Sequence, residues 1–191
     1  CITFFTGLLM WLLTRRYKRE LIPRDGFLLV TMAWVLLALA ATIPLYVNIE
    51  GISFVHAFFE ATSGITTTCG TILSGLDRLP LSVNFWRCFL AWMGGIGILV
   101  MAVAVLPLLG VGGSQIFRAE SSGPMKEGRL TPRIADTAKA FYNIYLAISV
   151  ACAVCYHFAG MDWDDAIMHT FTTVSLGGYS SHDAGFAYWP G

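Results

Sequence analysis

Long apolar runs alternate with shorter polar stretches along this sequence. Residues 27–46, 85–109 and 137–158 are each almost continuously apolar. About 20 helical residues, rising about 1.5 Å each, span the hydrocarbon core of a bilayer, so each run is long enough to cross it. Residues 1–14 are also apolar and predict the end of a preceding membrane helix. The pattern therefore predicts an all-α membrane protein.

Charge patterning gives these helices a direction. Hydrophobic residues make up 56% of the 191 positions and charged residues 13%, which is about half the charged fraction of a soluble domain. Ten of the twelve basic residues lie in two clusters, at residues 15–24 and 118–139, and both clusters predict cytoplasmic segments. Arg78 and Arg87 then fall in the outer loop or at its edge. The outer side holds seven of the twelve acidic residues.

The chain partly matches itself when it is shifted so that Pro23 is aligned with Pro132, and we call this shift the repeat offset. The other matched pairs are Arg24 and Arg133, Gly51 and Gly160, Ser53 and Asp162, and Ala57 and Ala166. Each copy has the same order: a Pro-Arg start, an apolar helix, a short helix, and a polar run rich in Thr, Ser and Gly. We therefore predict a repeated unit of helix, short helix with loop, and helix.

Two short helices are predicted, at residues 53–63 and 162–172. Ser53 and Asp162 are good N-cap residues, and each is followed by a short amphipathic stretch. Neither segment is long enough to cross a membrane. In the first unit the chain enters and leaves this segment on the outer side, so the segment is a re-entrant hairpin or an external loop.

The polar runs after the short helices have the composition of a cation filter. A dehydrated cation needs oxygen ligands in place of its water shell, and successive backbone carbonyls can supply them. Glycine permits the backbone angles required, and the C-terminal end of the preceding helix carries negative partial charge. A surface loop is the alternative for either run alone. Two runs at equivalent positions of a repeat favour the filter.

Several motifs resemble those of a known family. They are FEATSGITTT at residues 59–68, WR at 86–87, WMGGIG at 92–97, LPLLGVGG at 106–113, RAE at 118–120, PRIA at 132–135 and SLGGYSSHD at 175–183. Together they resemble the Trk/Ktr/HKT superfamily of potassium transporters, most closely its bacterial TrkH branch. The resemblance covers essentially the whole chain in order.

The resemblance implies four helix–pore loop–helix units around one potassium-channel-like pore, of which this chain would hold about one and a half. Since the sequence begins with Cys1 rather than Met, we expect an excerpt of a longer protein. The expected divisions are residues 1–14 as the end of a preceding transmembrane helix, 15–26 as a cytoplasmic basic loop, 27–109 as the first unit, 110–136 as a cytoplasmic loop, and 137–191 as the first helix and pore loop of the second unit.

The filter strands of the family, carried onto this sequence, fall in the two polar runs. The expected potassium ligands are the backbone carbonyls of Thr66, Thr67, Thr68, Cys69, Ser175, Leu176, Gly177 and Gly178. Each strand in the family has a central glycine, which is Gly178 in the second loop, whereas the first loop has Cys69 there. A side chain at this position restricts the backbone, so we expect relaxed selectivity between potassium and sodium.

The resemblance implies potassium uptake by a multi-pass protein of the bacterial inner membrane, passively or by symport. Potassium is then the transported ligand, and no organic cofactor is expected. The implied partners are a second copy of the chain, as a homodimer, and a cytosolic nucleotide-binding regulatory subunit. Beside membrane helices, the basic clusters indicate topology and contact with the lipid bilayer rather than nucleic acid binding.

Other functions remain as alternatives. One is a non-conducting or sodium-conducting membrane scaffold related to the family, which the departure at Cys69 leaves open. Another is a membrane enzyme, which is disfavoured because the sequence shows no nucleophile–base pair or metal-ligand cluster.

Three further features bear on the site. Glu60, on the first short helix, is expected either to hydrogen-bond the filter backbone or to attract cations directly. The glycines of residues 94–97 predict close helix packing, with a hinge as the alternative. Four histidines lack a metal-ligand spacing and are expected to be polar residues at the outer interface: His56, His157, His169 and His182.

Overall fold

The computed structural model describes residues 7, 12, 23–105 and 130–189. Almost all of the expected helix end before residue 15, most of the basic loop and residues 106–129 lie outside the described residues. Every regular element in the described part is helical: α2 (Pro23–Asn48), α3 (Phe54–Ile65), η1 (Leu76–Arg78), α4 (Leu81–Val105), α6 (Leu130–Phe158), α7 (Trp163–Val174) and η3 (Gly185–Tyr188). The predicted all-α fold is confirmed.

Three long helices contain segments that are apolar and long enough to cross a membrane. These segments are Phe27–Asn48 in α2, Leu81–Met101 in α4 and Asp136–Phe158 in α6, as the apolar runs predict. The helices themselves begin before those runs, since a helix can continue into polar sequence where water satisfies its backbone. The predicted end of the second run, at residue 109, lies outside the described residues.

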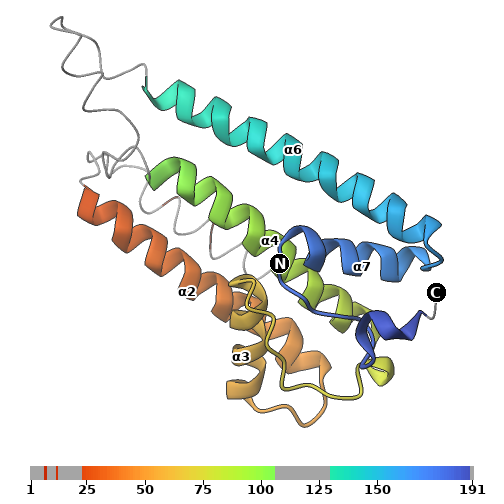
Figure 1. Cartoon of the computed structure of the whole chain (residues 1–191). Coiled ribbons are helices and arrows are strands. Elements are labelled where there is room, and N and C mark those ends of the chain that lie inside the picture. Colours follow the sequence, from red (N-terminus) through yellow and green to blue (C-terminus); the bar gives the residue numbers. More distant parts are fainter. Residues whose placement is uncertain (1–6, 8–11, 13–22, 106–129, 190–191) are drawn as a thin grey trace, which may run out of the picture.

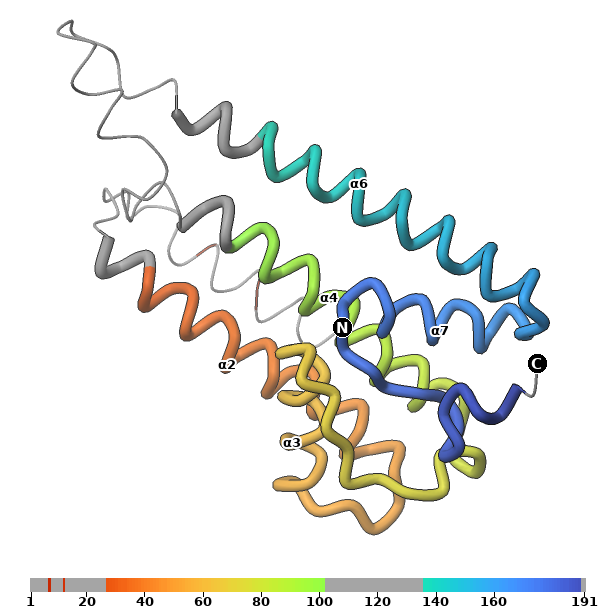
Figure 2. The backbone as a smooth tube through the Cα atoms, in the orientation of Figure 1, coloured from red at the N-terminus to blue at the C-terminus, as the bar shows by residue number. Residues whose placement is uncertain are grey.

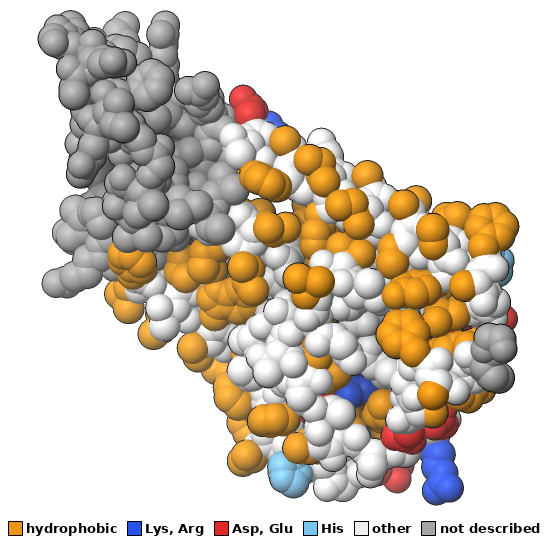
Figure 3. All heavy atoms as spheres, viewed as in Figure 1, with side chains coloured by type: hydrophobic (Ala, Val, Ile, Leu, Met, Phe, Trp, Pro, Cys, Tyr) orange, Lys and Arg blue, Asp and Glu red, His pale blue; other side chains and the backbone are white. Residues whose placement is uncertain are grey.

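The long helices lie side by side, with α4 between α2 and α6 (Figures 1 and 2). α3 packs against α2 and α4, and α7 packs against α4 and α6, at the same end of the bundle. Hydrophobic side chains cover much of the visible surface of the long helices, whereas acidic side chains gather mainly near the end that holds the short helices (Figure 3). Apolar outer surfaces of this kind suit contact with lipid or with further membrane helices.

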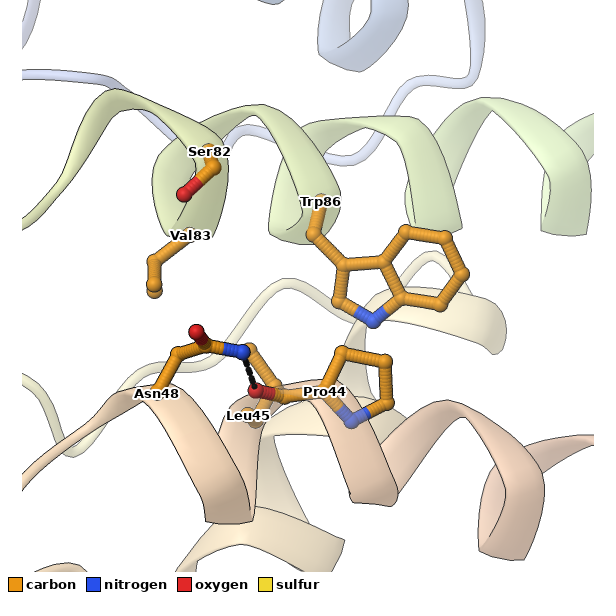
Figure 4. A pocket seen from close by; sticks show the side chains of 6 residues that line it. All are labelled: Pro44, Leu45, Asn48, Ser82, Val83 and Trp86. Carbon is orange, nitrogen blue, oxygen red and sulfur yellow. Dashed lines mark hydrogen bonds between the residues drawn. The ribbon is translucent and has the colours of Figure 1, made fainter.

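α2 and α4 meet where Pro44 interrupts the hydrogen bonding of α2 (Figure 4). Proline has no N–H, so the carbonyl oxygen of Ala40, four residues before Pro44, loses its usual donor. Trp86 of α4 donates from Nε1 to the carbonyl oxygen of Ala41 in that turn, at 3.0 Å. The side chain of Asn48 donates from Nδ2 to the carbonyl oxygen of Pro44, at 2.8 Å. Trp86 therefore adds a hydrogen bond between the two helices in the turn that the proline weakens.

Two glycines let α4 approach the ends of both short helices. A Cβ at Gly94 would collide with the carbonyl group of Ile65, the last residue of α3. A Cβ at Gly95 would lie 2.9 Å from the Cβ of Ser175, which follows α7, and 2.6 Å from the hydroxyl of Tyr145 on α6. A side chain at either position would push α4 away from the loops, which supports the packing interpretation of these glycines.

Candidate functional site

The two short helices are copies of one structure. α3 and α7 have 12 residues each, and both their first and their last residues are related by the repeat offset. Gly51 and Gly160, which precede them, both have positive φ, 75° and 103°. Ser53 caps α3 as predicted, since its Oγ accepts from the backbone N–H of His56 at 3.2 Å. Asp162 has the same extended backbone, but its side chain makes no capping hydrogen bond.

The loops that follow the short helices share their backbone conformation. Thr67 and Leu176 both have a φ of 57°, while Cys69 and Gly178 have φ of 51° and 111°. Left-handed backbone is uncommon for residues other than glycine. Its recurrence at positions related by the repeat offset means that one loop conformation is built twice. Cys69 therefore holds a conformation that glycine holds in the other loop.

A hydroxyl in the last turns of each short helix fixes the loop behind it. Ser63 donates from Oγ to the carbonyl oxygen of Gly70 at 2.7 Å. Thr172 donates from Oγ1 to the carbonyl oxygen of Tyr179 at 2.9 Å. Donors and acceptors in both bonds obey the repeat offset, so the repeat extends to the side chains that hold the loops.

The structure places the two sets of expected potassium ligands on neighbouring loops. A Cβ at Gly177 would lie only 2.5 Å from Sγ of Cys69, so the loops are in contact there. The loop residues alternate between exposed and more buried positions. The exposed ones include Thr66, Thr68, Leu176 and Gly178. Four of the eight expected ligands are therefore exposed residues of the two loops.

A fully buried ion pair lies behind the first loop. Nε of Arg87 on α4 lies 3.2 Å from Oε2 of Glu60 on α3, and both side chains are 0% exposed. Oε1 of Glu60 accepts from the hydroxyl of Thr71 at 2.6 Å and from the backbone N–H of Ile72 at 2.7 Å. Arg87 also donates to Thr71 Oγ1 at 2.9 Å and to Asn84 Oδ1 at 3.2 Å. Each charged group thus has several partners, as burial without water requires.

Tyr179 connects this ion pair to the second loop. Its hydroxyl lies 3.0 Å from the carbonyl oxygen of Glu60 and 3.1 Å from Oε2 of the same residue. The guanidinium of Arg87 lies over the tyrosine ring, 4.4 Å from its centroid, which is a cation–π geometry. One group of buried side chains therefore positions both loops.

The second unit has a histidine where the first unit has Glu60. His169 is related to Glu60 by the repeat offset and is equally buried, at 0% exposure. Its Nε2 lies 3.1 Å from Oγ of Ser180, and its Nδ1 lies 2.9 Å from the carbonyl oxygen of Asp165. The contact with Ser180 is the counterpart of the bond between Glu60 and Thr71. The predicted outer-interface position is therefore wrong for His169, because this side chain joins the short helix to its loop.

A second charged cluster joins the outer parts of the two units. Nδ1 of His182 contacts Asp77, and its Nε2 lies 3.3 Å from Oδ2 of Asp165. Asp183 accepts from the backbone N–H of Gly75 at 3.0 Å. Partial burial alone lowers the pKa of His182, but hydrogen bonds with Asp77 and Asp165 outweigh burial and raise it. The hydrogen bond from His182 in turn lowers the pKa of Asp77.

Comparisons with known proteins agree with this geometry. The TrkH family, described as a cation transport protein, matches residues 1–190. The chain belongs to the TrkH family. It is 49% identical over 189 residues to the Trk system potassium uptake protein TrkH of Vibrio parahaemolyticus, covering 98% of this chain and 39% of that protein.

Two further relatives extend this comparison for the TrkH-family chain. It is 47% identical over 192 residues to the Trk system potassium uptake protein TrkH of Escherichia coli, covering 98% of this chain and 40% of that protein. The crystal structure of the potassium transporter TrkH from V. parahaemolyticus matches with a TM-score of 0.84 at 45% identity, over 100% of this chain and 37% of that one. The chain therefore spans well under half of the length of these relatives.

Sequence reasoning placed two residues in the family motifs but assigned no role to them, and both organise the site of this TrkH-family chain. Arg87 is buried within α4 rather than at the edge of an outer loop. Its signal was an ionisable residue close to the start of an apolar run, which is costly unless it is paired. Tyr179 gave no such signal, since its partner Glu60 lies 119 residues away in sequence. Glu60 is expected either to hydrogen-bond the filter backbone or to attract cations directly. Its contact with the backbone N–H of Ile72 supports the first of these roles.

Replacing Arg87 with methionine should destabilise this TrkH-family fold strongly. The change leaves Glu60 buried without its charge partner, a loss of about 3–5 kcal/mol. Thermal unfolding of the intact protein in detergent measures the effect, with the exposed Arg78→Met as the matched control. The double change Glu60→Gln with Arg87→Met should recover part of the loss, because no unpaired charge remains. Equal stability of Arg87→Met and Arg78→Met would contradict the role of the pair.

The His182 cluster should make the stability of the protein depend on pH. Because folding raises the pKa of His182, its contribution is fully present below the unfolded pKa of about 6.5 and is lost as pH rises through the folded value. The contribution of Asp77 is present above its unfolded pKa of about 3.9 and is lost as pH falls through its lower folded value. The contact between His182 and Asp77 therefore contributes most to stability between about pH 3.9 and about pH 6.5.

Thermal unfolding of the intact protein should accordingly occur at lower temperature at about pH 8 than at about pH 6. His182→Gln should remove this component of the pH profile, whereas His56→Gln, at an exposed position, should retain it. An identical profile in wild type and His182→Gln would show that the contact contributes nothing to stability.

Proposed function

We propose that the intact protein takes up potassium ions through a filter lined by backbone carbonyls, two strands of which come from this chain. The observation that carries the proposal is the matched left-handed backbone of the two loops, at Thr67 and Cys69 in one and at Leu176 and Gly178 in the other. The relatives named as potassium uptake proteins support the same function.

The geometry suits a dehydrated monovalent cation. Carbonyl oxygens replace the water shell of such an ion when successive residues turn toward a common axis. The C-terminal ends of α3 and α7 lead directly into the two loops, so the negative end of each helix dipole lies close to them. We propose as ligands the carbonyls of Thr66, Thr67, Thr68, Cys69, Ser175, Leu176, Gly177 and Gly178.

Cys69 is the feature that we propose to relax selectivity. The backbone of Cys69 holds a left-handed conformation at the position equivalent to Gly178, and its Sγ lies beside Gly177 of the neighbouring loop. A residue with a Cβ has fewer ways to adjust its carbonyl than glycine has. The first strand is therefore proposed to discriminate less sharply between potassium and sodium.

The remaining assignments concern the intact protein. We propose a multi-pass protein of the bacterial inner membrane, in which the acidic cluster around Asp77, Asp165 and Asp183 lies at the outer side and concentrates cations. Further units complete a four-stranded filter, with a homodimer and a cytosolic nucleotide-binding regulatory subunit as the partners that the family implies. The proposal is transport rather than catalysis, and it includes no organic cofactor.

Rubidium uptake by the intact protein, in cells that lack their own potassium uptake, tests the proposal. Gly178→Asp should reduce uptake to the level of cells without the protein, because it strains a backbone at φ of 111° and adds a side chain to the filter. Ser74→Asp, at an exposed loop position, adds the same side chain outside the filter and should leave uptake unchanged. A well-expressed protein that passes neither rubidium nor sodium, with its regulatory partner supplied, would favour the scaffold alternative.

Cys69→Gly should raise the ratio of potassium to sodium permeability. Glycine adopts the left-handed conformation without strain, so the first strand should come to match the second. The ratio is measured from reversal potentials of the intact protein in proteoliposomes, with Cys152→Ala as a cysteine control on α6. An unchanged ratio in Cys69→Gly would remove Cys69 as the cause of relaxed selectivity.

A further inference from the structure

Three sulfur-containing side chains gather behind the first loop. Cys88 on α4 and Met168 on α7 form a buried cluster with Tyr179, at 0%, 1% and 3% exposure. Cys69, from the loop itself, packs against this cluster and is only partly buried. Sulfur-containing side chains from three separate segments therefore meet at one place, and neither thiol is in a disulfide.

The position of the Cys69 thiol connects the exposed loop to the buried cluster. A Cβ at Gly177 would lie 2.5 Å from Sγ of Cys69 and 3.5 Å from the Cβ of Ala91. Ala91 follows Cys88 by three residues on α4, so the two belong to the same face of that helix. Sγ of Cys69 therefore lies beside the second loop, and Cys69 packs against the cluster that includes Cys88 of α4.

The chemistry of this cluster selects a soft cation. Thiolate and thioether sulfur bind soft monovalent metals such as Cu(I), whereas carboxylate and carbonyl oxygen suit hard ions. Among the described residues, no group of three or more His, Cys, Asp or Glu side chains could hold a metal. The sulfur cluster is distinct from such a group because one of its three donors is a methionine.

We propose that Cys69, Cys88 and Met168 form a binding site for a soft monovalent cation, Cu(I) or Ag(I). Binding replaces the proton of the Cys69 thiol: the S–H bond breaks, a sulfur–metal bond forms, and the proton leaves to water. The cation and one thiolate together carry no net charge. The Met168 thioether completes the site as a neutral donor, and the Cys88 thiol, which keeps its proton, adds a weaker neutral contact. This suits an apolar cluster that would not accommodate a free charge.

Occupation of this site has a consequence for transport. A metal bound between Cys69 and Cys88 links the first loop to α4. It fixes the loop at Cys69, the position where the second loop has Gly178. The cation should therefore block the uptake of potassium. This consequence rests on the proposed function, whereas binding to the purified protein does not.

Silver nitrate titrated into the purified intact protein, in chloride-free buffer, tests the site directly. Bound silver is counted by mass spectrometry of the metal, and silver–thiolate bonds are followed by their ultraviolet absorption. Cys69→Ser keeps the size of the side chain but removes its soft donor, so silver affinity should fall by about tenfold or more. Cys88→Ala and Met168→Leu should each weaken binding, and Met168→Leu does so with little change in volume. Cys152→Ala, outside the cluster on α6, should bind as wild type does.

Two results would overturn the site. If Cys69→Ser binds silver with the stoichiometry and affinity of wild type, the first loop does not bind the metal. If Cys69→Ser loses binding while Cys88→Ala and Met168→Leu both bind as wild type, Cys69 reacts as an isolated thiol and the shared site does not exist. Each variant is first checked for an unchanged unfolding temperature without silver, so that loss of the fold is not mistaken for loss of the site.

Rubidium uptake in the presence of silver nitrate provides the second readout. Silver should inhibit wild type, and Met168→Leu should need more silver for the same inhibition. Inhibition of wild type and Met168→Leu at equal silver concentrations would overturn the link between the cluster and transport. If no variant takes up rubidium, the proposed function fails, while the binding titration still decides whether the site exists.

Discussion

The buried ion pair between Glu60 and Arg87 determines where both loops of this chain can lie. A carboxylate and a guanidinium removed from water must satisfy nearly all of their hydrogen-bonding groups, and the available partners are Thr71, Ile72 and Asn84, with the hydroxyl of Tyr179. Three of these partners belong to the two loops. Displacing either loop would therefore leave a charged group partly unsatisfied at a depth where water does not replace the loss. The charges behind the loops therefore help to hold their unusual backbone, together with the hydroxyls of Ser63 and Thr172.

Much of the fold could be predicted from the sequence, because length and periodicity are local properties. The three apolar runs and the two short helices appear close to their predicted places, and the repeat offset holds for backbone and side chains alike. The destinations of buried polar groups could not be predicted in the same way. The partner of Tyr179, the burial of His169 and the missing capping bond of Asp162 depend on how distant segments meet. A single sequence does not show which distant segments come into contact.

The two units use different chemistry to solve one structural problem. In each, a buried side chain on the short helix reaches the loop through a hydroxyl, from Glu60 to Thr71 and from His169 to Ser180. The acid in the first unit needs the arginine of α4, whereas a neutral imidazole needs no charge partner. The position on the helix and its contact with the loop are thus retained, while the charge is free to differ between copies.

Tyr179 and Gly70 occupy equivalent places in the two loops, yet only the tyrosine has a side chain with which to reach across. Its hydroxyl bonds to the first unit, and glycine offers nothing in return. The contact between the two units therefore has a direction, because the second unit supplies the hydroxyl donor and the first unit supplies the acceptors on Glu60. Two copies of the first unit could not form this contact, because neither would carry a tyrosine at the position of Gly70.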